Sequence, residues 1–249
     1  MKSPATTVGL DVPKNFVLAL EPMVSVIIPV LDEERWLPAC LDAVLPQVRE
    51  MGSEILVVDG GSSDSTRSVA RQGRVRLITS ARGRGLQMNT GAAQARGSLL
   101  VFLPADTRLP PGSLELLLDL DRTGSPQAGG FHQRFDHPRR LLRAVSALHN
   151  LRAVVSGVIY GDQVLFIRRE IFMELGGFRE DMNMEDVEFG SRLRRRVRPR
   201  LLNLVATTSA RRFDRAGDLR ATAEAVRILV SWTFLRRVPR SRTFFSPVR

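Results

Sequence analysis

Acidic side chains stand at or just after the ends of three apolar runs in this chain. Glu33, Asp59 and Asp106 hold these positions. Short β-branched runs of this kind predict strands buried on both faces of a parallel sheet, and ligands bind beyond the carboxyl ends of such strands. Carboxylates at this edge favour a ligand with donor groups, such as a base and a ribose. Asp106 can also hold a hard divalent cation, which keeps water molecules and takes phosphate oxygens as further ligands.

Each of these acids also has a structural explanation. Glu33 can stabilise the first turn of a helix through the helix dipole. Asp59 can cap the turn that follows it, at residues 60–63, and Asp106 can form a turn of its own. Three strand ends that each carry an acid are harder to explain in this way than one, so we expect a ligand site at this edge.

A second candidate lies at Met184-Glu185-Asp186, where a helix is predicted to begin. Asp186 at a helix N-terminus across from the sheet edge would be held rigidly enough to act as a general base. The structural alternative makes Asn183 the N-cap, with Asp186 at the third helical position. The pattern alone leaves both explanations open.

The glycine signatures of phosphate binding are missing from the first strand–helix junction. Residues 29–34 contain no glycine, which excludes a dinucleotide fingerprint there, and the P-loop pattern is also absent. A glycine cluster with a basic residue inside it occurs at Gly83-Arg84-Gly85. This segment can offer backbone N–H groups, together with Arg82 or Arg84, to an anion, or it is a plain helix N-terminus.

The elements that would position these residues alternate between strand and helix in the first half of the chain. Strands are predicted at 24–29, 55–59, 75–79, 99–103, 163–167 and 201–205, and helices at 33–48, from about 64, and at 85–96, 139–155, 184–195 and 218–235. Strand–helix alternation requires right-handed crossovers. The sequence therefore predicts an α/β fold with a doubly wound, mostly parallel sheet and helices on both faces.

The amino-acid composition limits the classes of partner that the protein could bind. The net charge of +11 suits a phosphate-bearing substrate, nucleic acid or an anionic membrane, or reflects a solvated arginine-rich surface. One Tyr and two Trp do not make a nucleic-acid stacking platform, so no nucleic-acid partner is expected. Cys40 is the single cysteine, and neither a signal peptide nor a spanning helix is predicted, which favours the cytoplasm. The basic amphipathic helix at 218–235 either lies peripherally on anionic lipid or packs on the domain with its arginines solvated.

Several segments together resemble a family 2 glycosyltransferase of the GT-A fold, from about residue 24 to residue 196. The broad resemblance rests on residues 24–29, Asp32-Glu33-Glu34, 55–66 and 161–178. The chain is most similar to the subgroup called radical-SAM/selenodomain-associated transferase 2, or arsenosugar-biosynthesis glycosyltransferase. The motifs behind this narrower resemblance are 83–91, Ala105-Asp106-Thr107, Gly161-Asp162-Gln163, Met184-Glu185-Asp186 and Ser209-Ala210-Arg211-Arg212.

The resemblance implies an inverting transfer of a sugar from a nucleotide donor, UDP- or GDP-linked, with Mg²⁺ or Mn²⁺ as cofactor. It implies a small-molecule or lipid-linked hydroxyl acceptor. By motif position Asp186 is the catalytic base, paired with Glu185, and Asp106 is the metal ligand. The remaining implied positions are donor-binding Pro29, Glu33, Asp59, Arg84, Gln87, Asp106, Arg211 and Arg212, and acceptor-side Gly161, Asp162 and Gln163.

The resemblance also implies a division of the chain. Residues 23–215 form the glycosyltransferase domain, with a nucleotide-binding half at about 23–110 and an acceptor half at about 111–215. Residues 1–22 are an N-terminal extension, and residues 216–249 are the basic helix and tail. Acceptor choice is expected in residues 129–161, which carry the least pattern.

Two departures from the family pattern bear on the activity. Pro104 stands where the Asp-x-Asp motif has its first Asp, and Leu31 stands where an aromatic side chain commonly packs on the base. A non-catalytic sugar-nucleotide-binding module of the same fold is therefore the alternative function. A nucleotidyltransferase on a similar sheet would need a basic first loop, and the acidic Asp32-Glu33-Glu34 argues against it.

Overall fold

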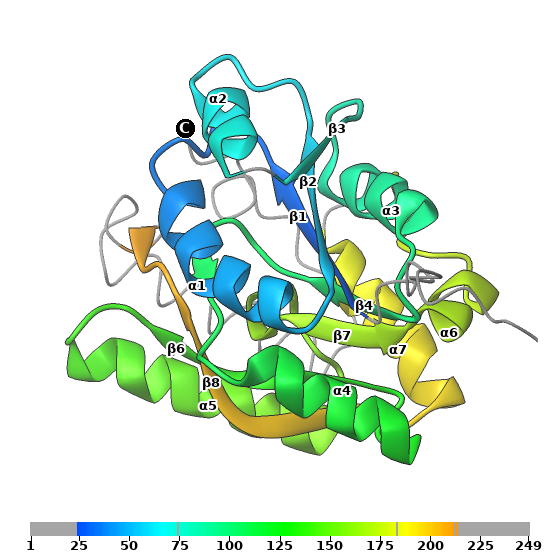
Figure 1. The fold of residues 1–249 in the computed structure, drawn as a ribbon. Coiled ribbons are helices and arrows are strands. Elements are labelled where there is room, and N and C mark those ends of the chain that lie inside the picture. Colours follow the sequence, from blue (N-terminus) through cyan, green and yellow to red (C-terminus); the bar gives the residue numbers. More distant parts are fainter. Residues whose placement is uncertain (1–23, 74, 183, 212, 214–249) are drawn as a thin grey trace, which may run out of the picture.

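The structure is a computed structural model that describes residues 24–73, 75–182, 184–211 and 213 (Figure 1). Its helices are α1 (Leu37–Glu50), α2 (Thr66–Gln72), α3 (Arg84–Gln94), α4 (Ser113–Thr123), α5 (Arg140–Ser156), the short 3-10 helix η1 (Gly161–Gln163), α6 (Arg169–Glu174) and α7 (Glu185–Arg196). Its strands are β1 (Val24–Val30), β2 (Glu54–Asp59), β3 (Arg76–Thr79), β4 (Leu99–Phe102), β5 (Thr107–Arg108), β6 (Ala128–Phe135), β7 (Leu165–Arg168) and β8 (Arg200–Thr208).

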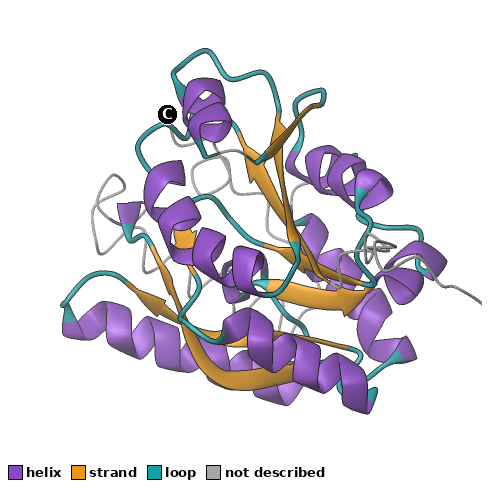
Figure 2. Cartoon of the chain, viewed as in Figure 1, coloured by secondary structure: helices purple, strands orange, loops and turns teal. Residues whose placement is uncertain are grey.

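The strands of the described residues form one eight-stranded sheet in the order β3-β2-β1-β4-β7-β6-β8-β5. The first four are parallel neighbours, as the strand–helix alternation predicts. Beyond β4 the sheet turns mixed, because β7 runs antiparallel to both β4 and β6, while β6 and β8 are parallel. The predicted α/β fold with a mostly parallel sheet and helices on both faces is confirmed (Figure 2).

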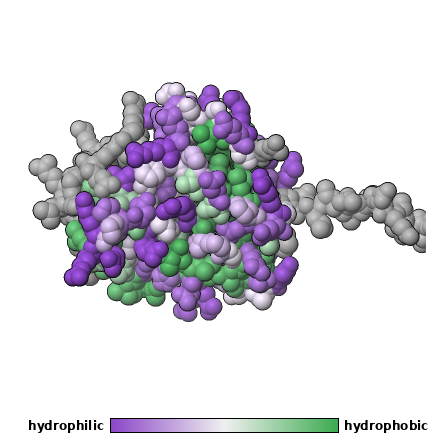
Figure 3. All heavy atoms as spheres, turned by 60° about the vertical axis from the view of Figure 1, so that its left-hand side comes forward, coloured by the Kyte–Doolittle hydropathy of each residue, from purple (hydrophilic) through white to green (hydrophobic). Residues whose placement is uncertain are grey.

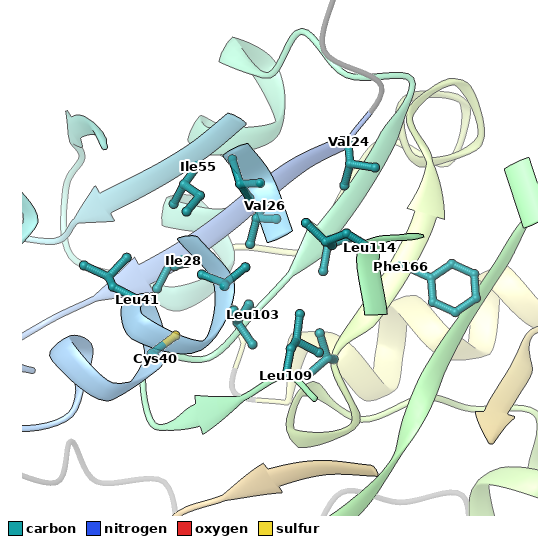
Figure 4. Close-up of a cluster of buried hydrophobic side chains, with 14 of the residues drawn as sticks. Val24, Val26, Ile28, Cys40, Leu41, Ile55, Leu103, Leu109, Leu114 and Phe166 are labelled. Atoms are coloured by element: carbon teal, nitrogen blue, oxygen red, sulfur yellow. The ribbon is translucent and has the colours of Figure 1, made fainter. Parts of the chain in front are cut away.

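Side chains that alternate along the central strands bury two separate cores. Val24, Val26 and Ile28 of β1 pack with α1 and α4 on one face (Figure 4). Ile27 points to the other face, where α3, α6 and α7 cover the sheet. Alternation with a period of two is what a strand geometry imposes, and burying each such side chain contributes roughly 1.5–3 kcal/mol. These two cores hold the strand ends rigidly.

Helix α1 begins later than predicted, at Leu37 rather than at residue 33. Asp32 has a left-handed φ of 54°, which breaks the regular backbone ahead of the helix. The backbone N–H groups of Trp36 and Leu37 then close a turn on the carbonyl of Glu33. The dipole explanation for Glu33 is therefore wrong, because its side chain lies outside the first helical turn.

Beyond β4 the chain contains five elements that the sequence pattern did not predict: β5, α4, β6, η1 and α6. Strand β6 was not predicted because Gly129 and Gly130 lie near its start, and glycine does not favour a strand. At Gly129 a Cβ would lie 2.0 Å from the carbonyl oxygen of Arg200, so the close approach of β6 to β8 requires glycine there. The strand predicted at 163–167 begins only at Leu165, after Val164 with its left-handed φ of 52°.

Two predicted segments lie outside the described residues: the N-terminal extension at 1–22 and the basic helix at 218–235. Among the helices that the structure does describe, none has the length and apolar character needed to cross a membrane.

Candidate functional site

The carboxyl ends of β1 and β2 lie side by side, since Val30 pairs with Asp59 in the sheet register. The buried side chain of Gln87, in α3, connects the two strand ends, because its Nε2 donates to the carbonyl oxygens of Val30 and Val58 at 2.8 Å each. Gly60 leaves the room for this amide, since a Cβ there would be 2.9 Å from the Gln87 side chain. The amide nitrogen of Gln87 is thus engaged in holding the strand ends.

Asp59 is fully buried at the end of β2 and serves the turn that follows. Its carboxylate accepts hydrogen bonds from the backbone N–H groups of Gly61 and Ser62 and from Nε of Arg67 at 2.5 Å. Burial raises the pKa of Asp59, but the hydrogen bonds from Ser62 and Arg67 outweigh burial and hold the pKa below its ordinary value. Asp59 is therefore an ionised carboxylate at the sheet edge.

Replacing Asp59 with Asn is expected to lower the free energy of unfolding by about 1–3 kcal/mol at neutral pH, because the N–H groups of Gly61 and Ser62 and the guanidinium of Arg67 lose a charged partner. The folded pKa lies below the unfolded value of 3.8, so this stability is present above that value and is lost as the pH falls through the folded pKa. Urea unfolding curves of the two proteins should therefore converge below about pH 4. A gap that stays constant as the pH is lowered would contradict this assignment.

Glu33 and Asp106 meet across a single guanidinium. Arg211 donates from Nη1 and Nη2 to the two oxygens of Glu33, at 2.7 Å each, and from Nε to Asp106 at 2.9 Å. The three side chains are only 11–13 % exposed. Burial lowers the pKa of Arg211, but its hydrogen bonds to Glu33 and Asp106 and the charges of these two carboxylates outweigh burial and raise it. We call this group the Arg211 cluster.

Two neighbours of the Arg211 cluster were not predicted to belong to it. The ring of Trp36 lies 5.4 Å from the guanidinium carbon of Arg211, close enough for a cation–π contact. Cys40 lies nearby in α1, and its pKa is raised first by burial and then by the charges of Asp106 and Glu33. A single tryptophan or cysteine in a helix carries no local signal for such a position.

A second charged group lies at the start of α7, and we call it the Arg84 cluster. Nη1 of Arg84 is 2.5 Å from Glu185 and 3.7 Å from Asp186. Asp186 accepts a 2.6 Å hydrogen bond from the backbone N–H of Gly161 and a 2.8 Å bond from that of Val187. The carboxylate of Asp186 is thereby fixed between η1 and α7.

The helix start at α7 differs from the predicted capping. The residue before the helix is Met184, with a left-handed φ of 68°, and it makes no side-chain cap. The prediction of Asn183 as N-cap is wrong by this position, and Asn183 itself lies outside the described residues. Asp186 bonds to Gly161 rather than only to its own helix, so its side chain reaches across to another element.

Four carboxylates act on Arg84. Burial lowers the pKa of Arg84, but Glu185, Asp186, Asp106 and Asp162 together raise it. For Glu185 the balance goes the other way, because burial raises its pKa more than the bond to Arg84 lowers it, and Asp186 adds to the rise. The charge of Asp106, a member of the Arg211 cluster, thus also acts on Arg84.

Strand β8 joins the two clusters. Its neighbour Ser209 donates its N–H to the carbonyl of Asp106, and the hydroxyls of Thr107 and Thr208 lie 3.0 Å apart. The Thr208 hydroxyl also donates to the carbonyl of Asp162 at 3.4 Å. These bonds connect the end of β8, just before Arg211, to η1 and to the loop of Asp106.

Helix α5 holds two residues of η1 by side-chain contacts. His149 Nε2 lies 2.9 Å from Asp162, and this neighbour, rather than the surface, is where His149 points. Burial raises the pKa of Asp162, but His149 outweighs it and the net pKa is lowered. Gln163 is held by Arg152 and Asn150 of the same helix. The thirteen-residue separation of His149 and Asp162 has no pattern that a sequence reading could detect.

The structure thus gathers most of the predicted residues at one edge of the sheet. Arg212 is the exception, since it lies outside the described residues. No group of three or more His, Cys, Asp or Glu within the described ranges is arranged to enclose a metal ion. A cation at this site would therefore depend on one or two carboxylates and on a ligand.

Comparison with known proteins agrees with this arrangement. A family model described as "Glycosyl transferase family 2" matches residues 25–198. The glycosyltransferase AglE of Haloferax volcanii is 39% identical over 93 residues, which are 34% of this chain and 31% of that protein. The chain therefore matches less than a third of the length of this curated relative.

Solved structures of similar fold include glucosyl-3-phosphoglycerate synthase of Mycobacterium tuberculosis, in complex with Mn²⁺, UDP and glucosyl-3-phosphoglycerate. It aligns with a TM-score of 0.62 at 21% identity and covers 88% of this chain and 82% of that chain. The mannosyltransferase PcManGT of Pyrobaculum calidifontis, in complex with GDP-Man and Mn²⁺, aligns with a TM-score of 0.60 at 24% identity, over 83% of this chain and 65% of that one. At these identities the likeness concerns the fold.

Proposed function

The chain belongs to glycosyl transferase family 2, and from this membership we propose that it moves a sugar from a nucleotide donor to a hydroxyl acceptor, with inversion at the anomeric carbon. Its eight-stranded mixed sheet has the GT-A fold. The observation that carries the proposal is the carboxylate of Asp186, fixed by two backbone N–H groups beside Arg84.

Asp186 is the general base of this proposal. Its carboxylate takes the proton of the acceptor hydroxyl while that oxygen attacks the anomeric carbon and the bond to the diphosphate breaks. The hydrogen bonds from Gly161 and Val187 hold Asp186 in one orientation, so no reorganisation is needed when the proton moves. Glu185 positions Arg84 through its ion pair.

The arginines stabilise the charge that develops on the departing diphosphate. Arg84 and Arg211 belong to the two charged clusters, and each is held by carboxylates that fix the guanidinium in place. Preorganised cations of this kind lower the barrier because they are aimed where charge appears. Arg212 is proposed for the same role from its place in the motif.

A divalent cation, Mg²⁺ or Mn²⁺, fits the charge balance of the site. The Arg84 and Arg211 clusters together hold four carboxylates and two guanidiniums, an excess of two negative charges when all are ionised. A diphosphate would add to this excess. Asp106 would hold the cation together with phosphate oxygens and water, and the cation would stabilise the leaving diphosphate.

The positions of the motif residues support the proposed places of the donor and the acceptor. Pro29, Glu33 and Asp59 would hold the nucleoside of a UDP- or GDP-sugar at the ends of β1 and β2. Gly161, Asp162 and Gln163 would face a small-molecule or lipid-linked hydroxyl acceptor. The motifs that resemble arsenosugar-biosynthesis glycosyltransferases support that narrower assignment as part of the proposal.

Donor and metal dependence are tested together by a thermal-shift panel of UDP- and GDP-sugars with and without Mn²⁺. At a donor concentration of about 100 times Kd the stabilisation is about 2.7 kcal/mol, which raises Tm by roughly 5–11 °C. We expect this rise with one class of base, a larger rise with Mn²⁺, and loss of the Mn²⁺ increment in Asp106→Asn. A panel without any rise would overturn the proposed donor class.

Gly161→Ala is expected to lower transfer while the fold is kept. A Cβ at residue 161 would lie 1.9 Å from Nη2 of Arg84, which is the mobile end of a side chain and can move aside. Displacing a positioned group by about 1 Å costs up to about 10²-fold in rate. We expect kcat to fall by about that factor in a protein that still folds, with a Tm lowered by the weakened Arg84–Glu185 pair.

The matched control is the double variant Arg84→Ala/Gly161→Ala. If residue 161 acts by displacing Arg84, the double variant should be no slower than Arg84→Ala alone. Additive losses in kcat would show that Gly161 matters for another reason.

A further inference from the structure

Five large apolar side chains of one helix, α5, are exposed to solvent. Leu151, Val154 and Val155 are 58%, 64% and 77% exposed. With Leu141 and Leu148 they make up what we call the α5 stripe. Five of the seven Leu and Val residues of this helix thus point outward. Apolar surface gathers along the lower edge of the molecule in Figure 3, where α5 runs in Figure 1.

The α5 stripe is one continuous face. Leu141, Leu148 and Val155 are seven residues apart, and Leu151 falls between the last two, which places them along one side of a helix. Of the seven exposed large hydrophobic side chains in the described residues, all but two belong to this stripe. A concentration of this kind marks an interaction surface, whereas scattered apolar residues do not.

Contacts of the inner face of α5 explain why the helix is not rotated about its axis to bury its apolar residues. Asn150 bonds to Gln133 and Gln163, and Arg152 bonds to Gln163 and to the carbonyl of Val158. These polar bonds fix which side of the helix faces the protein. Leu142, Ser146 and Ala153 are buried on the face between them, so the apolar residues on the far side of the helix are held at the surface.

The charge around the α5 stripe points to the partner. Helix α5 contains no Asp or Glu, and Arg140 and Arg143 are exposed at its start. At its end Arg194 donates to the carbonyl of Ser156. Arginines at both ends disfavour a second copy, because a two-fold pairing of antiparallel helices would place like charges opposite each other. They complement an anionic surface.

We propose that α5 binds to an anionic lipid surface, with its stripe among the acyl chains and its arginines at the headgroups. An exposed apolar face flanked by basic residues is the pattern of helices that lie in a membrane interface. His149, on the same helix, bonds to Asp162 in η1. If the proposed function holds, a lipid-linked acceptor would then reach the site from this side, whereas lipid binding itself does not depend on it.

The test is cosedimentation of the full chain with vesicles, without donor or acceptor. We expect binding to vesicles of phosphatidylglycerol and phosphatidylcholine, weaker binding to phosphatidylcholine alone, and a loss of binding at high salt. Leu151→Glu should weaken partitioning into the vesicles by at least about tenfold, because a charge replaces an apolar side chain that would lie among the acyl chains. Arg140→Glu/Arg143→Glu should weaken binding to the anionic vesicles alone.

The matched control is Met173→Glu, since Met173 is an exposed apolar side chain on α6, at 43% exposure. This variant should bind vesicles like the unchanged protein. Equal losses in Leu151→Glu and Met173→Glu, or wild-type binding by Leu151→Glu, would overturn the proposal. So would an absence of vesicle binding, or light scattering that shows a dimer which Leu151→Glu dissociates. Tm of every variant, measured in parallel, identifies any that fails to fold.

Discussion

Asp186→Asn is expected to lower kcat for sugar transfer by about 10²–10⁴-fold, the range that a positioned general base contributes. Asparagine has one acceptor oxygen, so it keeps the hydrogen bond from the N–H of Gly161 or of Val187 but not both, while the ion pair of Arg84 with Glu185 at the start of α7 should remain. Asparagine cannot take a proton at neutral pH. Donor binding, measured by calorimetry, should therefore stay within a few-fold of the unchanged protein while turnover is lost.

The control for Asp186→Asn is Asp181→Asn. Asp181 is an exposed acid that pairs with Arg179 in the loop before α7, and it touches neither charged cluster. Its replacement should leave kcat unchanged. Near-normal turnover by Asp186→Asn would remove Asp186 from the mechanism. Donor binding without turnover in the unchanged protein would instead favour the non-catalytic module.

Arg211→Ala is expected to have the second largest effect, because it removes the cation that joins Glu33 to Asp106. Breaking a buried pair costs about 3–5 kcal/mol, and since these side chains are 11–13 % exposed we expect the lower end. Transfer should fall by about 10²-fold or more, as a preorganised charge is lost at the diphosphate.

A purely structural role would not predict what Arg211→Ala does to metal binding. With the guanidinium gone, Glu33 and Asp106 keep their negative charges, so Mn²⁺ should bind about tenfold more tightly in the absence of donor. Titration calorimetry measures this directly. Arg211→Lys keeps the charge without the fork-shaped geometry, and we expect it to fold but to transfer slowly.

Arg67→Ala is the matched control for Arg211→Ala. It removes another arginine–aspartate pair at the same edge, that of Asp59, where the Arg67 side chain is 41% exposed. It should reduce stability without tightening Mn²⁺ binding. If the Mn²⁺ affinity of Arg211→Ala is unchanged, Arg211 and Mn²⁺ do not compete for the carboxylate of Asp106. The assignment of Asp106 as metal ligand would then fail.

The central sheet could be predicted because its strands carry their own signal. Residues 24–29 and 55–59 are short runs rich in Val and Ile, and such runs are typical of strands buried on both faces. Element ends were less predictable. The start of α1 depends on the left-handed φ of Asp32, and β6 depends on the fit of Gly129 against Arg200, neither of which is a local pattern.

By itself, the sequence determined the parallel half of the sheet and the presence of acids at its edge. The point at which each apolar run stops marks the end of a strand, so Asp59 and Asp106 could each be identified from the sequence. Their partners were decided by the tertiary structure alone. Arg211 lies 178 residues from Glu33, and Arg84 lies 101 from Glu185. Ion pairs over such separations have no period along the chain, because packing of distant elements, rather than local propensity, brings the charges together.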